Sequence, residues 1–327
     1  MANLATTYLG LGLKNPLVVA SCSLSGNVDG VKKIADAGAG AVVLKSLFEE
    51  QMEAETKEVE QYITHSWHTE AYDYVRNMGM ELGPNQYLKL VEQAKKAVSI
   101  PVIASLNCIS TRWWSEYATK LENAGADALE LNVSFMPSNP GRSSKDIEQL
   151  YFSIVENVKS RINIPVAVKI GPYFTSMSLF AQEMFRRGVD ALVLFNRFYQ
   201  VDIDTEKLAL KHGYSLSSPE EITLPLRWIA LLSDKIECDF AATTGVYDGE
   251  AAIKMLLAGA KVVQVCSTLY KNGLGQIKKM NKEIEAWMKK QNFETVDQFC
   301  GKLNHDSTEK YELLERLQYI KALVGFE

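Results

Sequence analysis

A short pattern recurs four times along the chain: a glycine that follows a helical segment, and then a run of apolar residues. The four copies are AGAGAVVLK (residues 37–45), AGADALELN (124–132), RGVDALVLFN (187–196) and AGAKVVQVC (258–266). Glycine suits the left-handed conformation that ends many helices, and a run that is apolar on both faces is typical of a buried parallel strand. The repeat therefore predicts a chain assembled from helix–strand units.

Four other apolar runs lie between these copies, and three of them have a proline near their start. They are NPLVVAS (residues 15–21), IPVIASLN (100–107), IPVAVKIG (164–171) and ECDFAATTG (237–245). Helical spacing of apolar residues fills the gaps at residues 27–37, 87–98, 112–123, 145–161, 177–187, 224–234, 248–257 and 274–291. Eight strands alternating with eight helices predict an α/β fold, a (β/α)₈ TIM barrel. An open doubly wound sheet is the alternative, and the internal repeat favours the closed form.

Two segments are longer than ordinary connections: residues 46–83 after the second strand and residues 197–222 after the sixth. Long loops at the carboxyl ends of barrel strands usually cover the active site. Both segments contain aromatic residues, which suits either a lid over a flat ligand or packing against the barrel rim. Residues 295–325 are expected to form further helices that close the end of the barrel, so that residues 1–327 make one barrel domain.

Composition narrows the class of function. The net charge is −5, with 47% hydrophobic and 23% charged residues, which favours neither nucleic acid nor an anionic membrane as a partner. No apolar run approaches the length of a membrane span, and no signal peptide is visible, so we expect a cytoplasmic protein. The five cysteines contain no C-x-x-C pair, and the HSWH motif (residues 65–68) has no third ligand nearby, so we expect no metal site.

Polar residues gather where the predicted strands end. In a TIM barrel these positions face the active site. Asparagine amides suit the polar edges of a flavin or pyrimidine ring, and a lysine stabilises negative charge that develops there. The positions are Ala20, Ser21, Lys45, Ser46, Asn107, Asn132, Ser134, Lys169, Asn196, Thr244, Gly245, Cys266 and Ser267.

A phosphate site is predicted between the last two strands. Thr244 and Gly245 end the seventh strand just before a helix that Asp248 can cap, and Cys266 and Ser267 follow the eighth strand. Backbone N–H groups of these two loops, with a helix N-terminus, form the usual phosphate site of such barrels.

Taken in order, these pieces resemble the FMN-dependent dihydroorotate dehydrogenases and the related flavin domain of dihydropyrimidine dehydrogenases. The resemblance runs from about residue 9 to about residue 303. Its pieces are NPLVVAS, VLKS (residues 43–46), RNMGM (76–80), PVIAS (101–105), ADALELNVS (126–134), NPG (139–141), AVKIGPYF (167–174), Asn196, TTG (243–245) and QVCSTLY (264–270).

The resemblance implies oxidation of dihydroorotate to orotate in pyrimidine biosynthesis. It also implies a homodimer. FMN would be bound by the strand-end residues above, with Lys169 and Lys45 supporting charge on its ring. The implied substrate residues are Asn77, Met78, Gly79, Met80, Asn132 and Asn196.

The sequence departs from this family at the base that removes the substrate proton. The family has a cysteine or serine there, whereas this chain has Phe135 or Met136, with Ser134 and Ser138 as the nearby hydroxyls. Ser134 is therefore the predicted catalytic hydroxyl. Cys22 stands where the family commonly has glycine, and Arg197 where it has a small residue.

These departures leave other functions open. One is an FMN-dependent reductase of another pyrimidine-like or enone substrate. Another is a catalytically silent flavin-binding barrel, and a further one is a phosphosugar aldolase or isomerase that binds no flavin.

Overall fold

The protein forms a closed barrel of eight parallel strands. The computed structural model describes residues 2–52, 83–108, 111–136, 138–197, 201–211, 215–304, 316, 319–321 and 323–325. The barrel strands are β3 (Leu17–Val19), β4 (Ala41–Val43), β6 (Val102–Asn107), β7 (Ala128–Asn132), β8 (Val166–Ile170), β9 (Ala191–Leu194), β12 (Asp239–Thr243) and β13 (Val262–Val265). They pair in chain order, β13 pairs with β3, and the β4–β6 pairing completes the circle. The predicted TIM barrel is confirmed.

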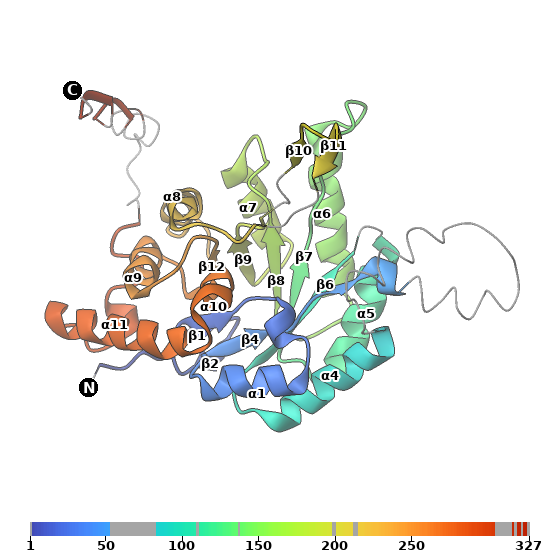
Figure 1. Ribbon diagram of the computed structural model, residues 1–327. Coiled ribbons are helices and arrows are strands. Elements are labelled where there is room, and N and C mark those ends of the chain that lie inside the picture. The colour runs from blue at the N-terminus through green and yellow to red at the C-terminus, as the bar shows by residue number, and fades with distance from the viewer. Residues whose placement is uncertain are drawn as a thin grey trace, which may run out of the picture.

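One helix lies outside the barrel after each strand (Figure 1). These helices are α1 (Val28–Asp36), α4 (Pro84–Ala97), α5 (Thr111–Asn123), α6 (Ser144–Lys159), α7 (Met177–Arg186), α8 (Thr223–Leu232), α9 (Gly249–Ala258) and α11 (Gly275–Gln291). Local sequence sets several of their ends. Asn27 caps α1 through the N–H of Gly30 at 2.8 Å, and Ser143 forms a capping box with Asp146 at the start of α6.

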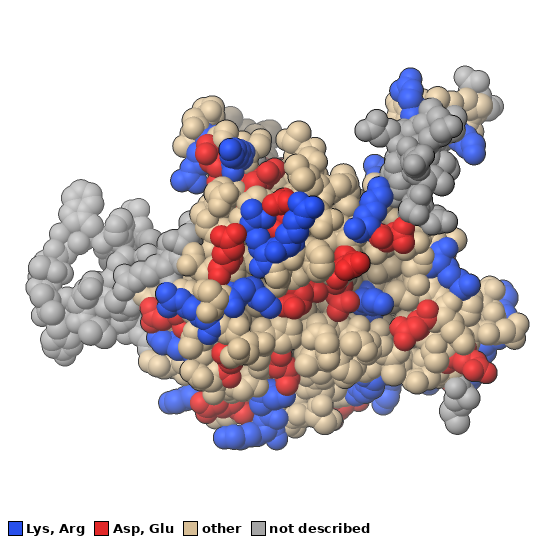
Figure 2. All heavy atoms as spheres, turned by 180° about the vertical axis from the view of Figure 1, so that it is seen from behind, with Lys and Arg blue, Asp and Glu red and all other residues tan. Residues whose placement is uncertain are grey.

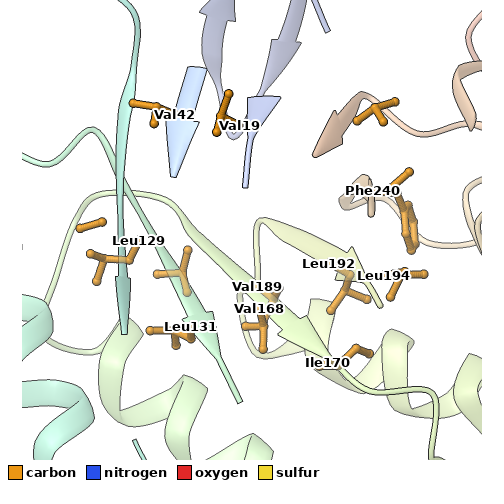
Figure 3. Close-up of a cluster of buried hydrophobic side chains, with 14 of the residues drawn as sticks. Val19, Val42, Leu129, Leu131, Val168, Ile170, Val189, Leu192, Leu194 and Phe240 are labelled. Atoms are coloured by element: carbon orange, nitrogen blue, oxygen red, sulfur yellow. The ribbon is translucent and has the colours of Figure 1, made fainter. Parts of the chain in front are cut away.

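The core has two layers because alternate residues of each strand point to opposite sides of the barrel wall. Leu129 and Leu131 of β7 and Val168 and Ile170 of β8 belong to the outer layer, which packs against the helices (Figure 3). Smaller side chains such as Ala128 and Ala167, on the same strands, belong to a separate cluster inside the barrel. Both layers are buried.

A short N-terminal hairpin closes the amino end of the barrel. It consists of β1 (Thr6–Tyr8) and β2 (Leu11–Leu13), and its Tyr8, Leu9 and Leu13 pack into the inner cluster. The expectation that residues 295–325 form helices that close the barrel stays a prediction, because much of that segment lies outside the described residues. That segment begins with the short 3₁₀ helix η3 (Val296–Gln298), and the described residues from 316 onward are exposed.

The described parts of both long loops lie at the carboxyl end of the barrel. The loop after β4 begins with β5 (Leu47–Phe48), which pairs with β6. The loop after β9 contains the hairpin β10 (Asp202–Asp204) and β11 (Ala209–Lys211), which lies above β7 and β8 in Figure 1. It also contains the 3₁₀ helix η2 (Pro219–Ile222). Two further short helices are η1 (Ser23–Ser25) after β3 and α10 (Ser267–Asn272) after β13.

Charges of both signs are interspersed on the face that Figure 2 shows. Among the described helices, none has the length and apolar character needed to cross a bilayer. The described residues also contain no cluster of three histidine, cysteine or acidic side chains that could hold a metal ion, and the HSWH motif lies outside them.

Candidate active site

A cavity of about 540 Å³ opens at the carboxyl ends of the barrel strands. All eight strand ends contribute to its wall. Thirteen predicted site residues line it: Ala20, Ser21, Lys45, Ser46, Asn107, Asn132, Ser134, Lys169, Asn196, Thr244, Gly245, Cys266 and Ser267. The other four, Asn77, Met78, Gly79 and Met80, lie outside the described residues.

The cavity wall also contains residues that sequence reasoning did not assign to the site. They are Cys22, Ser23, Phe48, Phe195, Arg197, Ser217, Thr243, Val246 and Gln264. Gln264 had a detectable signal, because it is a lone polar residue inside an apolar strand. It lies two residues before Cys266, and residues two apart on a strand share a face.

The cavity wall is cationic. Lys45, Lys169 and Arg197 line it, and none of its described lining residues is Asp or Glu. The Arg197 guanidinium is paired with Glu221, its Nε lying 2.7 Å from Oε2. Within the described part of the chain Lys169 makes no ion pair, so a structural ion pair does not explain its place. A cationic, partly enclosed cavity favours an anionic ligand.

Two asparagines bridge the wall above Lys169. The Asn196 amide donates to Oδ1 of Asn132 at 2.5 Å. The bond joins the ends of β7 and β9, and Lys169 is the register partner of Asn132 on β8. Each amide keeps one polar atom for a ligand, Nδ2 on Asn132 and Oδ1 on Asn196.

Three serine hydroxyls form a chain on the opposite wall. Ser21 Oγ lies 3.0 Å from Ser46 Oγ, which lies 2.8 Å from the buried Oγ of Ser105. The N–H of Ser46 also donates to Ser21 Oγ at 2.9 Å. These bonds fix the loops after β3 and β4 next to Lys45, so this wall is preorganised before any ligand binds.

The predicted phosphate turn has an unusual backbone. Thr244 and Gly245 both have φ of +77°, and a non-glycine residue there carries strain that is most often found at functional sites. The Thr244 hydroxyl donates to the carbonyl of Phe195 at 3.3 Å. A Cβ at Gly245 would lie 2.4 Å from the backbone nitrogen of Ile222, so only glycine fits.

The two helices beside this turn differ at their N-termini. As predicted, Asp248 caps α9, accepting from the N–H of Ala251 at 2.8 Å, and Glu283 accepts from Gly249 at 2.7 Å. Those two carboxylates occupy the start of α9. The start of α10 has no side-chain cap, and its Ser267 lines the cavity. The helix that can assist anion binding is therefore α10.

A buried pair of polar side chains lies at the base of the cavity. Gln264 and Glu130 are each 1% exposed, and the Gln264 amide donates to Oε2 of Glu130 at 2.5 Å. Gln264 lines the cavity, and its own Oε1 has no hydrogen-bond partner among the described residues. Buried polar atoms are normally satisfied, so this oxygen fits a ligand or an ordered water in the cavity.

The loop after β7 shows where the apolar residues at the expected base position lie. The Phe135 ring packs edge-on against Tyr151, with centroids 5.5 Å apart, and lines a second cavity of about 240 Å³ with Phe174. Met136 is 52% exposed, and Ser138 is exposed as well. Neither Phe135 nor Met136 lines the main cavity, so Ser134 is the hydroxyl that this loop presents to it.

The fold and the site together define a class of protein. A TIM barrel with a cationic cavity at the carboxyl ends of its strands is the usual architecture of an enzyme that binds a phosphorylated ligand. Comparison with known proteins gives the family. Residues 3–288 match the family model described as dihydroorotate dehydrogenase.

Proteins of several organisms are similar to most of the chain. One from Thermoplasma volcanium, named dihydroorotate dehydrogenase B (NAD(+)), catalytic subunit, is 27% identical over 92% of this chain and 98% of its own length. A protein of the same name from Methanocaldococcus jannaschii is 29% identical over 91% and 97%. The chloroplastic dihydropyrimidine dehydrogenase (NADP(+)) of Arabidopsis thaliana is 26% identical over 96% and 80%.

The chain belongs to the dihydroorotate dehydrogenase family, whose members are oxidoreductases that act on CH–CH bonds. The family implies a flavin cofactor. The described lining fits a flavin phosphate: its cations would neutralise the phosphate, and the unpartnered Gln264 Oε1 and the free asparagine atoms offer donors and acceptors for a polar ring edge.

Proposed function

We propose that this protein binds FMN and oxidises dihydroorotate to orotate, in pyrimidine biosynthesis. The observation that carries the proposal is the joint position of Lys45, Lys169 and the Thr244–Gly245 turn in one cavity wall. The turn and the start of α10 would hold the phosphate, and the two lysines would face the ring. Membership of the family supports the reaction type.

Each group in the wall has a proposed task. The amides of Asn132 and Asn196, with residues 77–80, would orient the flat ring of the substrate. Their mutual hydrogen bond at 2.5 Å would hold both amides in place before the substrate arrives. Lys169 and Lys45 would stabilise negative charge that develops in the cavity during hydride transfer. When bound, FMN supplies the two-electron chemistry.

The reaction removes a hydride from one substrate carbon and a proton from its neighbour. We assign the proton to Ser134 Oγ, since Ser134 faces the cavity and Phe135 does not. Within the described residues no carboxylate or histidine lines the cavity to assist that hydroxyl. A serine without a partner is a weak base, so we expect slow turnover that rises with pH.

The proposal is tested by mixing the purified, coloured protein with dihydroorotate without oxygen. Loss of the visible flavin absorption, with formation of orotate, is the expected result. Chromatography of the released chromophore identifies it as FMN. A protein that stays colourless in the presence of excess FMN would contradict the proposal, and so would flavin that stays oxidised with dihydroorotate and every other substrate offered.

A second candidate is reduction of another pyrimidine-like ring on the same cofactor. Position 135 is phenylalanine and not the cysteine or serine of the family, which favours this second candidate. One relative is also named a dihydropyrimidine dehydrogenase. The same assay separates the two: dihydrouracil, and uracil with a pre-reduced protein, would then change the flavin spectrum while dihydroorotate would not.

A further inference from the structure

Two cysteines lie in the cavity wall at the ends of neighbouring strands, and the proposed oxidoreductase reaction uses neither thiol. Cys22 follows β3 and Cys266 follows β13, and both line the cavity. The two strands are neighbours, with Val19 in register with Val265. The N–H of Ala20 donates to the carbonyl of Val265 at 3.0 Å, so Cys266 directly follows the last paired residue of its strand and Cys22 lies two residues past Ala20.

The placement of the two cysteines allows a disulfide. A disulfide spans about 4.4–6.8 Å between Cα atoms, a reach that two residues in the adjoining loops of neighbouring strands can meet. The Cys266 side chain is the largest single influence on the pKa of Cys22, as expected for neighbouring thiols.

Hydrogen bonds hold the two loops together. The N–H of Ser23 donates to the Tyr270 hydroxyl at 3.1 Å, and the Ser23 hydroxyl lies 2.5 Å from the same oxygen. The Cys22 carbonyl accepts from Ser25 Oγ at 3.0 Å, and the Cys266 carbonyl accepts from the N–H of Leu269 at 2.8 Å. The backbone beside each thiol is therefore fixed.

The two thiols differ in acidity. The hydrogen bond from Cys266 lowers the pKa of Cys22 to about 7, with further help from the backbone at Leu24 and Ser25. The same contact raises the pKa of Cys266, and burial raises it further. Near neutral pH Cys22 thus supplies a thiolate beside a protonated partner. Burial raises the pKa of Cys108, Cys238 and Cys300 instead.

We propose that Cys22 and Cys266 are an oxidation site, at which a peroxide converts two thiols of the cofactor cavity into a disulfide. The Cys22 thiolate attacks one oxygen of hydrogen peroxide, the O–O bond breaks, and Cys22 becomes a sulfenic acid with release of hydroxide, which takes up a proton to form water. The sulfur of Cys266 then attacks the sulfenic sulfur. The S–O bond breaks, a second water leaves, and the disulfide forms.

The chemistry assigns the roles: Cys22 is the attacking thiol and Cys266 the resolving one. The inference goes beyond the proposed function, because the disulfide needs no bound flavin. Its consequence for the cavity does rest on that function. A disulfide would tie the loop after β3 to the loop after β13, across the wall that we propose holds FMN.

The test uses the full-length protein, reduced and then exposed to hydrogen peroxide near neutral pH. After quenching, unfolding and alkylation, we expect two of the five thiols to be lost and to return with dithiothreitol. Peptide mapping should find one cross-link, between Cys22 and Cys266. Retention of all five thiols, or a cross-link through another cysteine, overturns the proposal.

Two substitutions separate the roles, and a third is the matched control. In Cys266→Ser, Cys22 should stop at the sulfenic acid and react with dimedone. In Cys22→Ser, the remaining thiols should survive the same treatment. Cys300→Ser, whose thiol donates to the Ala260 carbonyl away from the cavity, should behave as the parent protein does. Equal thiol loss in Cys22→Ser and the parent overturns the assignment.

Added FMN distinguishes this inference from the proposed function. If FMN occupies the cavity, it should slow disulfide formation, and the disulfide should weaken FMN binding. A disulfide that forms at the same rate with and without FMN supports the cysteine pair and contradicts FMN binding at this wall. If no cross-link forms with or without FMN, the proposed Cys22–Cys266 disulfide is contradicted. FMN binding is then decided by the separate flavin assay.

Discussion

At the scale of single residues, Lys169 is the most direct test of the cavity. It lines the wall beside Asn132 and has no ion-pair partner among the described residues. Lys169→Met should lower the rate of flavin reduction by about 10²–10³-fold, the usual effect of losing one charge-stabilising group, and should weaken FMN binding. Stopped-flow absorbance and flavin fluorescence measure the two. Lys32→Met, on the exposed side of α1, should change neither.

Ser134 and Phe135 differ in what their side chains face. Ser134→Ala should lower turnover by about 10²-fold or more, as loss of a proton acceptor does. Phe135→Ser should not raise turnover, because that side chain points toward Tyr151 and not into the main cavity. Steady-state rates with dihydroorotate measure both. A gain of activity in Phe135→Ser would show that the loop can present position 135 to the substrate.

The backbone conformation and the limited space at position 245 both require glycine. A Cβ there would lie 2.4 Å from Ile222 N at a φ of +77°, so Gly245→Ala should destabilise the fold by about 1–3 kcal/mol or more and release FMN. Gly125→Ala is the matched control, since its φ is +90° with nothing within 4 Å of the added Cβ. It should cost only the backbone strain. Thermal unfolding with and without FMN measures both, and equal losses would refute the steric argument.

At the scale of elements, the barrel strands and their helices were predictable from local sequence. The spacing of apolar residues, and the glycines and prolines at the ends of the elements, are local properties. Residues 6–13 gave no such pattern: two strands of three residues joined by a Leu9–Gly10 turn are too short for alternation to be seen. The hairpin of residues 202–211 was missed for the same reason. Short hairpins are decided by what they pack against, and no local pattern encodes that.

One partly buried carboxyl accepts a hydrogen bond from the N-terminal hairpin. Asp239 Oδ2 accepts from the N–H of Leu9 at 2.8 Å, and burial raises the pKa of Asp239. The folded state therefore holds this proton more tightly than the unfolded chain, whose value is about 3.9. Its contribution to stability is full below that pH and is lost as pH rises through the folded pKa.

Asp239→Asn tests the direction of this pH dependence, because the amide keeps an acceptor for Leu9 and cannot ionise. The stability of the parent protein, measured relative to Asp239→Asn by urea unfolding, should fall as pH rises from the acid side and then level off. Asp239→Ala removes the acceptor and should be less stable than Asp239→Asn at every pH. A relative stability that rises with pH would contradict the raised pKa.

At the scale of the whole molecule, the positions of the cavity residues were predictable and their mutual contacts were not. Strand ends such as Lys45 and Lys169 must share one mouth once eight parallel strands close into a barrel. The bond between Asn132 and Asn196, and the direction in which Phe135 points, depend on loop conformations that single-strand patterns do not encode. The contact between Gln264 and Glu130 was not predictable either, because the two residues lie across the closed barrel from each other.

That pair gives a test of barrel closure itself. Glu130 on β7 and Gln264 on β13 are separated by three strands in the sheet, so their 2.5 Å bond joins opposite walls. Gln264→Leu leaves a buried carboxyl without its donor and should cost about 3–5 kcal/mol. Glu130→Leu leaves a neutral amide unpaired and should cost about 1–3 kcal/mol.

The double substitution should cost less than the sum of the two, because neither polar group then remains unpaired in the barrel. Urea unfolding of the four proteins should give a coupling free energy of about 1–3 kcal/mol. The exposed pair Lys120–Glu116, at 2.8 Å on one helix, serves as the control double-mutant cycle. Its coupling free energy should be about 0.3–0.5 kcal/mol. Equal coupling in the two cycles would mean that the buried bond adds nothing to the closure of the barrel beyond what a surface ion pair adds to its helix.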